Sequence, residues 1–321
     1  MKRDVRRAAG AEGERPLRRL LIRRRLFLVL SARIGYDPKS CQGFNMIAKS
    51  ILITGCSSGI GLCVAQGLAA RGWNVFASCR SGDDVERLRA QGLQCVQLDV
   101  TDDDSIDAAL EAVLAASGGR LDAVFNNAGY GQPGAAEDIG RTALEQQFDT
   151  NLFGPWQLTR RVLPIMRRQG QGRILFNSSI LGFAAMKWRG AYNASKYAIE
   201  GLCDTLRLET AGSGIQVVLI EPGPISSRFR PNALQQFLRH VDIEHSVHAD
   251  AYRAQLERLR REGAAAPFTL PPEAVLAAAI KALDSPRARA RYRVTFPTRL
   301  FWYLKRLLPT RCFDAVLRRA A

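Results

Sequence analysis

Short apolar, β-branched runs alternate with longer stretches of helical periodicity from Lys49 onward. The apolar runs predict strands at residues 50–55, 74–79, 94–100, 122–128, 173–178, 215–221 and 291–295. Helical patterns lie between them, near residues 60–71, 83–91, 103–117, 142–169, 191–213 and 271–284. Strands that are apolar on both faces and alternate with helices are typical of a parallel sheet covered on both sides. We therefore predict one α/β domain over residues 46–297, with a doubly wound sheet of about seven strands.

Residues 226–270 break this alternation, because polar and basic residues dominate there and apolar ones such as Phe229 and Phe237 are scattered. A long segment this late in an α/β chain is usually a lid or binding loop, or else disordered. We interpret residues 226–270 as a substrate lid.

The net charge of +16 is concentrated at the two ends of the chain. Residues 1–45 hold twelve Lys or Arg and four Asp or Glu, and residues 287–321 hold ten basic residues with Asp314 as the only acid. The stretch between them is close to neutral, which argues against a nucleic-acid-binding core, where basic residues line a folded face. Basic ends can contact an anionic membrane or another polyanion, or can simply be solvated.

The basic extension over residues 1–45 has arginines ahead of a short apolar core at residues 26–30. It has the look of a secretory leader without a convincing cleavage site, or of a transit peptide weakened by its acids. A third possibility is that translation starts at Met46. In each case we expect the extension to be disordered or not translated, and we exclude it from the fold.

Residues 298–321 form a basic amphipathic segment with several apolar and aromatic side chains between Arg299 and Leu308. Such a segment can make peripheral contact with a membrane, or it can cap a pocket or form a subunit contact. No apolar run approaches the roughly 20 residues needed to span a bilayer. The seven cysteines are irregularly spaced and form no C-x-x-C pair, so they predict neither disulfides nor a metal site, but reduced thiols of a cytoplasmic protein.

A glycine-rich turn joins the first strand to the first helix, with the sequence Thr54-Gly55-Cys56-Ser57-Ser58-Gly59-Ile60-Gly61. Glycines allow the backbone to turn sharply and approach a ligand, while the helix N-terminus offers free N–H groups to a pyrophosphate. The turn lacks the Gly-Lys-Ser/Thr ending of a nucleotide-hydrolysing loop. It is therefore a candidate dinucleotide site in a Rossmann-like domain; the alternative is a turn that only packs a strand against a helix.

The end of the second strand distinguishes the two nicotinamide dinucleotides. An acid there would bond the adenosine ribose, whereas a basic residue suits a 2′-phosphate. The strand closes with Arg80, so we favour NADP(H) over the alternative of an exposed arginine at a strand end. Asp99, after the third strand, is a candidate acceptor for the adenine amino group, or equally a helix cap.

Tyr192 and Lys196 lie four residues apart and share one face of a predicted helix. A free phenol has a pKa of roughly 10, and a nearby ammonium together with the positive nicotinamide ring favours the phenolate. Ser179 follows the fifth strand, where its hydroxyl would polarise a carbonyl, or it is a turn serine. Asn151 falls inside a helical pattern, where Asn is unfavourable; it is a kink, a core hydrogen bond or part of a proton relay.

Taken together, these residues resemble the short-chain dehydrogenase/reductase family over roughly Lys49 to Thr295. Thr54 to Gly61 matches the cofactor turn, and Asp99 matches the adenine-contacting acid. The remaining matches are the motif Asn126-Asn127-Ala128-Gly129, the tetrad of Asn151, Ser179, Tyr192 and Lys196, and the nicotinamide loop Pro222-Gly223-Pro224-Ile225-Ser226-Ser227. Ser227 stands where the family usually has Thr, which is a conservative change.

The resemblance implies an NADP(H)-dependent enzyme in which Tyr192 is the acid–base group, Ser179 holds the carbonyl oxygen, Lys196 binds the nicotinamide ribose and Asn151 completes a relay. It is most similar to bacterial NADP-dependent aldehyde reductases, and through them to hydroxysteroid and retinol dehydrogenases. The family also implies a homodimer or homotetramer that packs through the helices carrying Asn151 and Tyr192.

The residues expected to form the substrate pocket are mainly apolar and aromatic, which predicts a lipophilic aldehyde or ketone. They are Tyr130, Leu181, Phe183, Met186 and Trp188, together with the lid. The main alternative is a hydroxysteroid or retinol dehydrogenase that works as an oxidant. A sugar-nucleotide epimerase would need a larger C-terminal domain, and a non-catalytic NADP-binding or membrane-associated protein has no need of Tyr192 and Lys196 together.

Overall fold

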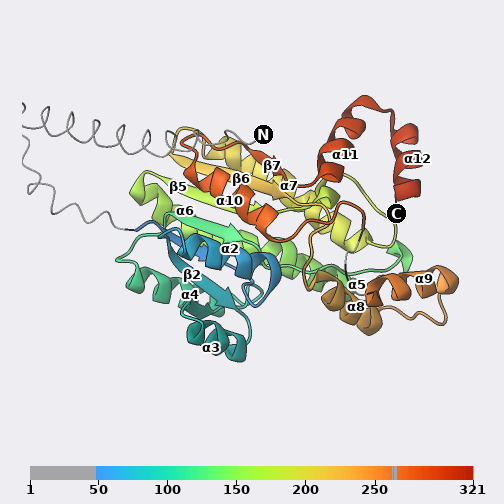
Figure 1. The fold of residues 1–321 in the computed structure, drawn as a ribbon, viewed down its shortest axis with the longest axis horizontal. Helices are drawn as coiled ribbons and strands as arrows, with labels where there is room; N and C mark the ends of the chain where they lie inside the picture. The colour runs from blue at the N-terminus through green and yellow to red at the C-terminus, as the bar shows by residue number, and fades with distance from the viewer. Residues whose placement is uncertain (1–47, 262, 264–265, 321) are drawn as a thin grey trace, which may run out of the picture. The chain divides into compact units, whose positions relative to one another are not determined.

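The computed structural model describes residues 48–320 except 262 and 264–265, so the basic extension and Met46 lie outside the described residues. The described chain contains one sheet in which all neighbouring strands are parallel, in the order β3-β2-β1-β4-β5-β6-β7. The strands are β1 (Ser50–Ile53), β2 (Asn74–Cys79), β3 (Gln94–Gln97), β4 (Ala123–Asn126), β5 (Gly172–Asn177), β6 (Ile215–Glu221) and β7 (Arg291–Arg293). The predicted doubly wound sheet is confirmed (Figure 1).

Helices cover both faces of the sheet. Successive residues of each strand point to opposite sides, so that a continuously apolar strand makes both faces apolar and both must be covered. Ile51 and Ile53 of β1 enter one core, while Leu52 between them enters the other. The first core packs against α2 (Gly59–Ala69), α3 (Gly82–Ala90) and α10 (Glu273–Asp284), and the second against α4 (Asp103–Ala116), α6 (Gly154–Gln169) and α7 (Gly190–Glu209). Each fully buried aliphatic side chain stabilises the fold by about 1.5–3 kcal/mol, which explains the continuous apolar runs.

The strand order reverses between β1 and β4, the position where ligands bind in open α/β sheets. Because all strands are parallel, their carboxyl ends share one edge of the sheet. Beyond this edge lie the helices α8 (Phe229–His240), α9 (Ala249–Arg260), α11 (Phe296–Leu307) and α12 (Thr310–Ala320) (Figure 1). These helices therefore surround the region where a ligand is expected.

The helix predicted over residues 142–169 is divided into three parts. Helix α5 (Arg141–Phe148) leads into a π-helical turn, η3 (Asp149–Phe153), and α6 then continues from Gly154. Such π turns widen a helix locally and are frequent at functional sites. The turn contains Asn151, so the unfavourable Asn marks a local distortion of the helix.

The described part of the lid is folded as the two helices α8 and α9. The buried rings of Phe237 on α8 and Tyr252 on α9 pack 5.0 Å apart. The Tyr252 hydroxyl accepts a hydrogen bond from the Ala135 N–H at 2.8 Å and donates one to Asp138. The described part of this segment is thus ordered and held against the loop after β4, and its role as a substrate lid stays a prediction.

The C-terminal segment forms helices α11 and α12, beginning two residues before the predicted boundary at 298. Phe301 and Phe313 are buried and belong to the apolar cluster that contains Tyr192. The six cysteines within the described residues are free, and no cluster of metal ligands occurs among these residues. None of the described helices combines the length and apolar character required to cross a membrane.

Candidate active site

The glycine-rich turn has a backbone that only glycine fits at two positions. Gly55 has a φ of +71°, and a Cβ there would lie 2.8 Å from the Ala128 Cα atom. A Cβ at Gly61 would lie 2.3 Å from the Gly55 carbonyl oxygen. The N-cap Ser58 makes no side-chain cap hydrogen bond, so the first N–H groups of α2 stay available to a ligand. The turn thus has the two properties that a pyrophosphate requires, close approach and free donors.

Asn127 ties this turn to β4 and to the catalytic region. Its backbone N–H donates to the Thr54 hydroxyl and its side-chain amide donates to the Thr54 carbonyl, both at 2.9 Å. Its side-chain oxygen accepts a hydrogen bond from the Asn177 amide at 2.9 Å. Sequence reasoning placed Asn127 in the motif but chose its neighbours Asn126, Ala128 and Gly129 as cofactor contacts. The Asn126 side chain donates to the Thr159 hydroxyl at 3.2 Å.

The loop Pro222–Ser227 reaches the same region from the end of β6. A Cβ at Gly59 would touch the Ser227 Cβ at 3.1 Å, so the two cofactor segments lie against each other. The Pro222 carbonyl accepts a hydrogen bond from the Ile180 N–H at 2.7 Å. A Cβ at Gly223 would lie 2.2 Å from the Thr295 hydroxyl, and Ile225 forms a bridge with Leu270.

Two arginines lie near the adenosine end of the proposed cofactor site. Arg80 is exposed directly after β2, and its carbonyl accepts a hydrogen bond from Gln97 at 3.0 Å. Arg87 on α3 donates to the Ser57 carbonyl at 2.8 Å and pairs with Asp84 at 2.6 Å. Arg87 was not predicted from the sequence, because nothing in the pattern of α3 indicates that its side chain reaches the glycine turn.

The sequence is compatible with Asp99 as a cofactor contact or as a helix cap. The residue that caps α4 is Asp102, which accepts from the Asp104 and Ser105 N–H groups. The Asp99 carboxylate accepts from the backbone and hydroxyl of Thr101, at 3.0 and 2.8 Å. Asp99 therefore shapes the turn after β3 and is not the cap of the following helix.

Tyr192 and Lys196 are buried on the inner face of α7. The Lys196 Nζ atom lies 5.7 Å from the centre of the Tyr192 ring and donates to the Asn177 carbonyl at 2.7 Å. Asn177 also contacts Asn127, so one chain of hydrogen bonds runs from Lys196 to the glycine turn. The lysine is thus held between the tyrosine and the site proposed for the cofactor.

The surroundings of these two groups shift both pKa values. Burial raises the pKa of Tyr192 to about 12, and the Ser179 hydroxyl and the Arg189 charge act in the opposite direction. Burial lowers the pKa of Lys196 to about 8, while the Glu200 carboxylate acts to raise it. Arg189 is thus a positive neighbour of the phenol that the sequence did not predict, in addition to Lys196, whose Nζ atom lies 5.7 Å from the ring centre. At neutral pH the phenol is protonated, as a proton donor must be.

Asn151 is fully engaged by the π turn that carries it. Its side chain accepts from the Tyr130 N–H at 3.1 Å and donates to the Tyr130 carbonyl at 2.9 Å. It also donates to the Ser195 hydroxyl at 3.1 Å, and Ser195 lies on α7 between Tyr192 and Lys196. Asn151 thereby fixes the loop after β4 against the helix of the tyrosine.

Ser179 ends the loop after β5 and is buried. Its hydroxyl accepts a hydrogen bond from the Leu181 N–H at 3.1 Å, at the start of the short 3-10 helix η4 (Ile180–Gly182). It therefore caps this short helix. The same hydroxyl also lowers the pKa of Tyr192, so its second role is exerted on the phenol.

Four of the five residues predicted to line a substrate pocket divide into two groups. Leu181, Phe183 and Met186 pack in one apolar cluster with Tyr192. Trp188 instead packs on the lid, with its ring 4.9 Å from His248 and 5.8 Å from Tyr252. Its φ of +62° is rare for a residue with a side chain, and such conformations are concentrated at functional sites.

Residues from distant parts of the chain complete this apolar region. The Phe229 ring of α8 lies 5.3 Å from the Tyr192 ring, and Phe301 and Phe313 of α11 and α12 belong to the same cluster as Tyr192. The fifth predicted residue, Tyr130, is half-buried at the loop after β4. The sequence indicated an amphipathic segment over residues 298–321, but it showed neither the helix α8 nor what the apolar faces of these helices contact.

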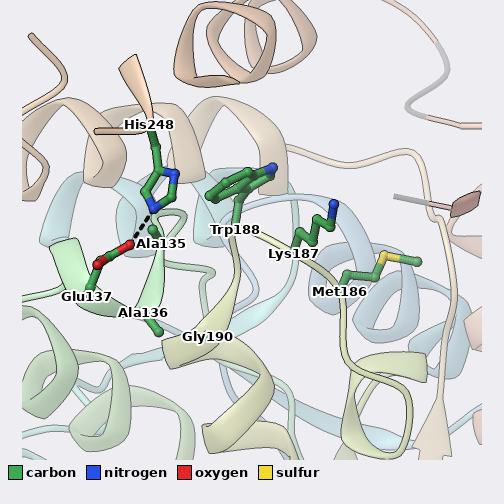
Figure 2. A pocket seen from close by; sticks show the side chains of 8 residues that line it. All are labelled: Ala135, Ala136, Glu137, Met186, Lys187, Trp188, Gly190 and His248. Atoms are coloured by element: carbon green, nitrogen blue, oxygen red, sulfur yellow. Dashed lines mark hydrogen bonds and ion pairs between the residues drawn. The ribbon is translucent and has the colours of Figure 1, made fainter. Parts of the chain in front are cut away.

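A cavity of about 410 Å³ lies between the start of α7 and the lid (Figure 2). It is lined by Ala135, Ala136, Glu137, Met186, Lys187, Trp188, Gly190 and His248. His248 and Glu137 are joined across it by a 2.5 Å contact between Nε2 and Oε1. Sequence reasoning named Met186 and Trp188 but missed His248 and Glu137, which are 111 residues apart in the chain.

The chain matches a family model described as short chain dehydrogenase over residues 49–236. It is 44% identical over 274 residues to "Uncharacterized oxidoreductase YbbO" of Escherichia coli strain K12, covering 85% of this chain and 96% of that protein. It is 36% identical over 261 residues to 17-beta-hydroxysteroid dehydrogenase type 1 of Homo sapiens, covering 76% and 77% of the two chains. The chain is 37% identical over 198 residues to retinol dehydrogenase 8 of Homo sapiens, covering 59% of this chain and 62% of that protein.

Solved structures give the same result. A short-chain dehydrogenase from Streptomyces avermitilis matches with a TM-score of 0.68 and 30% identity, over 82% of this chain and 94% of that one. A short chain dehydrogenase/reductase from Burkholderia phymatum in complex with NAD matches with a TM-score of 0.68 and 25% identity, over 82% and 96%. The chain therefore belongs to the short-chain dehydrogenase/reductase family of oxidoreductases, as its motifs predicted.

Proposed function

We propose that this enzyme interconverts a lipophilic aldehyde or ketone and its alcohol, with NADP(H) as cofactor and Tyr192 as the acid–base group. The observation that carries the proposal is the position of the Tyr192 phenol. It is buried among apolar side chains, beside Ser179 and Lys196, at the carboxyl edge of the sheet. In the reductive direction the phenol donates its proton to the carbonyl oxygen, while NADPH supplies the hydride.

The neighbouring residues assist this proton transfer. The Ser179 hydroxyl polarises the carbonyl by donating a hydrogen bond to its oxygen. Lys196, held by the Asn177 carbonyl, binds the nicotinamide ribose. Asn151 keeps the loop at Tyr130 and the hydroxyl of Ser195 in place, which positions the tyrosine helix. In the alcohol-oxidising direction the same phenol must first lose its proton.

Arg80 supports NADP(H) over NAD(H). Its exposed guanidinium follows β2, where a 2′-phosphate would lie, and Arg87 adds a second positive charge beside the glycine turn. The pyrophosphate would lie over Gly55–Gly61, Asp99 would face the adenine, and Pro222, Gly223, Ile225 and Ser227 would hold the carboxamide. Asn126, Ala128 and Gly129 would line the remaining edge of the cofactor.

The apolar cluster around Tyr192 supports a lipophilic substrate. Tyr130 and Trp188 would line the edges of the substrate pocket. A hydroxysteroid or retinol dehydrogenase acting as an oxidant is the second candidate, since relatives with these names match much of the chain. We also propose a homodimer or homotetramer, which is supported by exposed apolar residues on the helices around Asn151 and Tyr192. These are Leu144, Phe153, Tyr197 and Leu208. The cytoplasmic location expected from the free thiols stays a prediction.

The test is a panel of substrates with the purified enzyme, in which the oxidation of the cofactor is measured by its absorbance. We expect NADPH oxidation with medium-chain aldehydes, retinal or ketosteroids, and turnover at least about tenfold slower with NADH, because only NADPH offers a phosphate to Arg80. Short charged keto acids serve as the comparison. A preference for these acids would contradict the lipophilic pocket, and a preference for NADH would contradict the cofactor assignment.

Arg189 is expected to tune the proton transfer. Its charge lowers the pKa of Tyr192, so Arg189→Met should raise that pKa. Because alcohol oxidation needs the deprotonated phenol, the pH at which the oxidation rate is half-maximal should rise by about 0.5–1 unit. Lys187→Met, two residues away and exposed, is the matched control and should leave the profile in place. The measurement is kcat/KM against pH; an unchanged profile in Arg189→Met would exclude this effect.

A further inference from the structure

Helix α11 has two apolar faces, and only one of them packs against the protein. Phe301 is buried and Leu304 and Leu308 are partly buried in the cluster that contains Tyr192. On the other face Phe296, Leu300, Tyr303 and Leu307 are 57%, 40%, 59% and 76% exposed. Their spacing places them in one stripe along the helix. We call these four residues the α11 stripe.

A fifth exposed apolar residue extends the α11 stripe. Phe268, in the loop before α10, is 60% exposed, and its ring lies 5.2 Å from that of Phe296. Its φ of +63° is a left-handed conformation that residues with a side chain rarely adopt. This backbone conformation holds a largely exposed aromatic ring beside Phe296, and such conformations are concentrated at functional positions.

Positive charge surrounds this apolar surface. Six exposed basic residues lie on α11 and α12, and Asp314 is the only acid on these two helices. They are Arg299, Lys305, Arg306, Arg311, Arg318 and Arg319. Apolar and aromatic side chains flanked by Lys and Arg are typical of helices that lie in the interface of an anionic membrane.

The α11 stripe is held in place by the folded protein. Thr295 caps the helix by accepting from the Thr298 N–H, and the Trp302 ring lies between the guanidinium groups of Arg293 and Arg306, at 4.0 and 3.8 Å. Lys305 donates to the Phe183 carbonyl at 2.5 Å. The helix therefore packs beside η4, directly after Ser179, and its packed face belongs to the apolar cluster around Tyr192.

We propose that the α11 stripe and Phe268 dock on the surface of an anionic lipid bilayer, which brings the apolar region at Phe183 next to the lipid. A lipophilic substrate would then pass from the bilayer to the site; this second clause rests on the proposed function, whereas the docking does not. A second copy of the chain fits less well, because a symmetric contact would bring the basic flanks of both copies together.

The test is sedimentation of the full-length protein with large unilamellar vesicles. Wild-type protein should pellet with phosphatidylcholine vesicles that contain phosphatidylglycerol, and much less with phosphatidylcholine alone or in high salt. The triple substitution Leu300→Gln, Tyr303→Ser and Leu307→Gln should weaken binding to the anionic vesicles by at least about tenfold. Leu238→Gln, at a leucine that is 53% exposed on α8, is the matched control and should bind like wild type.

Three results would overturn the proposal. The first is wild-type protein that stays in the supernatant. The second is a triple variant that pellets like wild type, because the basic extension at residues 1–45 would then do the binding. The third is a triple variant whose mass in solution, measured by light scattering, is lower than that of wild type, because the stripe would then join two copies. Turnover of a short water-soluble aldehyde should be equal in all variants. If no carbonyl is reduced by any of them, the proposed function fails, while the vesicle result still decides the docking.

Discussion

Replacing Tyr192 by Phe should abolish turnover, with a loss of about 10²–10⁴ in kcat. The substitution removes only the hydroxyl that donates the proton and leaves the ring that packs against Phe229 and the apolar cluster. NADPH binding should be kept, because Lys196 is held independently by the Asn177 carbonyl. The loss therefore falls on the chemical step and not on assembly of the site.

The measurements are single-turnover NADPH oxidation and NADPH affinity by fluorescence titration. Tyr197→Phe is the matched control, since Tyr197 lies on the same helix and is 39% exposed; it should turn over like wild type. Full activity in Tyr192→Phe would rule out the phenol as proton donor. Absence of carbonyl reduction in the wild type, with NADPH still bound, would instead favour a non-catalytic NADP-binding protein.

Replacing Gly61 by Ala should remove cofactor binding and destabilise the fold by about 1–3 kcal/mol. The new Cβ would lie 2.3 Å from the Gly55 carbonyl oxygen and 2.6 Å from the Asn127 amide nitrogen. Both are held, because Asn127 bonds to Thr54 and to Asn177. The turn must shift to relieve the contact, and this shift moves the N–H groups that would meet the pyrophosphate.

Gly201→Ala is the control for this substitution. Gly201 lies on α7 with nothing within 4 Å of its ideal Cβ, so alanine there should be neutral or stabilising by up to about 1 kcal/mol. Urea unfolding gives the stability of each variant, and titration with NADPH gives its affinity. Wild-type affinity in Gly61→Ala would mean that the close contact at this turn is not needed for the cofactor.

The sheet and its two covered faces were predictable because their signals are local. Alternation such as Ile51, Leu52 and Ile53 follows directly from strand geometry, and parallel strands need crossover helices. The ends of the predicted elements were less accurate. The strand predicted over residues 94–100 ends at Gln97 in the structure, where it is β3. Leu98 and Val100 are also buried, but they pack in the core after the strand has ended. Burial and strand pairing produce the same apolar pattern.

The distortion at Asn151 shows a second limit. The sequence contained an unfavourable residue in a helical pattern, which is compatible with a kink, a core bond or a functional contact. The π turn, and the bonds from Asn151 to Tyr130 and Ser195, exist because the loop after β4 is pressed against α7. Only the packed structure could choose among the three interpretations.

The sequence by itself determined the fold class, the glycine turn and the tyrosine–lysine pair, since each is set by residues close together in the chain. The tertiary structure decided that Phe229 and Phe301 join the surroundings of Tyr192, that His248 meets Glu137, and that one face of α11 stays exposed. The reason is physical: periodicity reports that a side of a helix is apolar, but packing of distant segments decides what that side contacts.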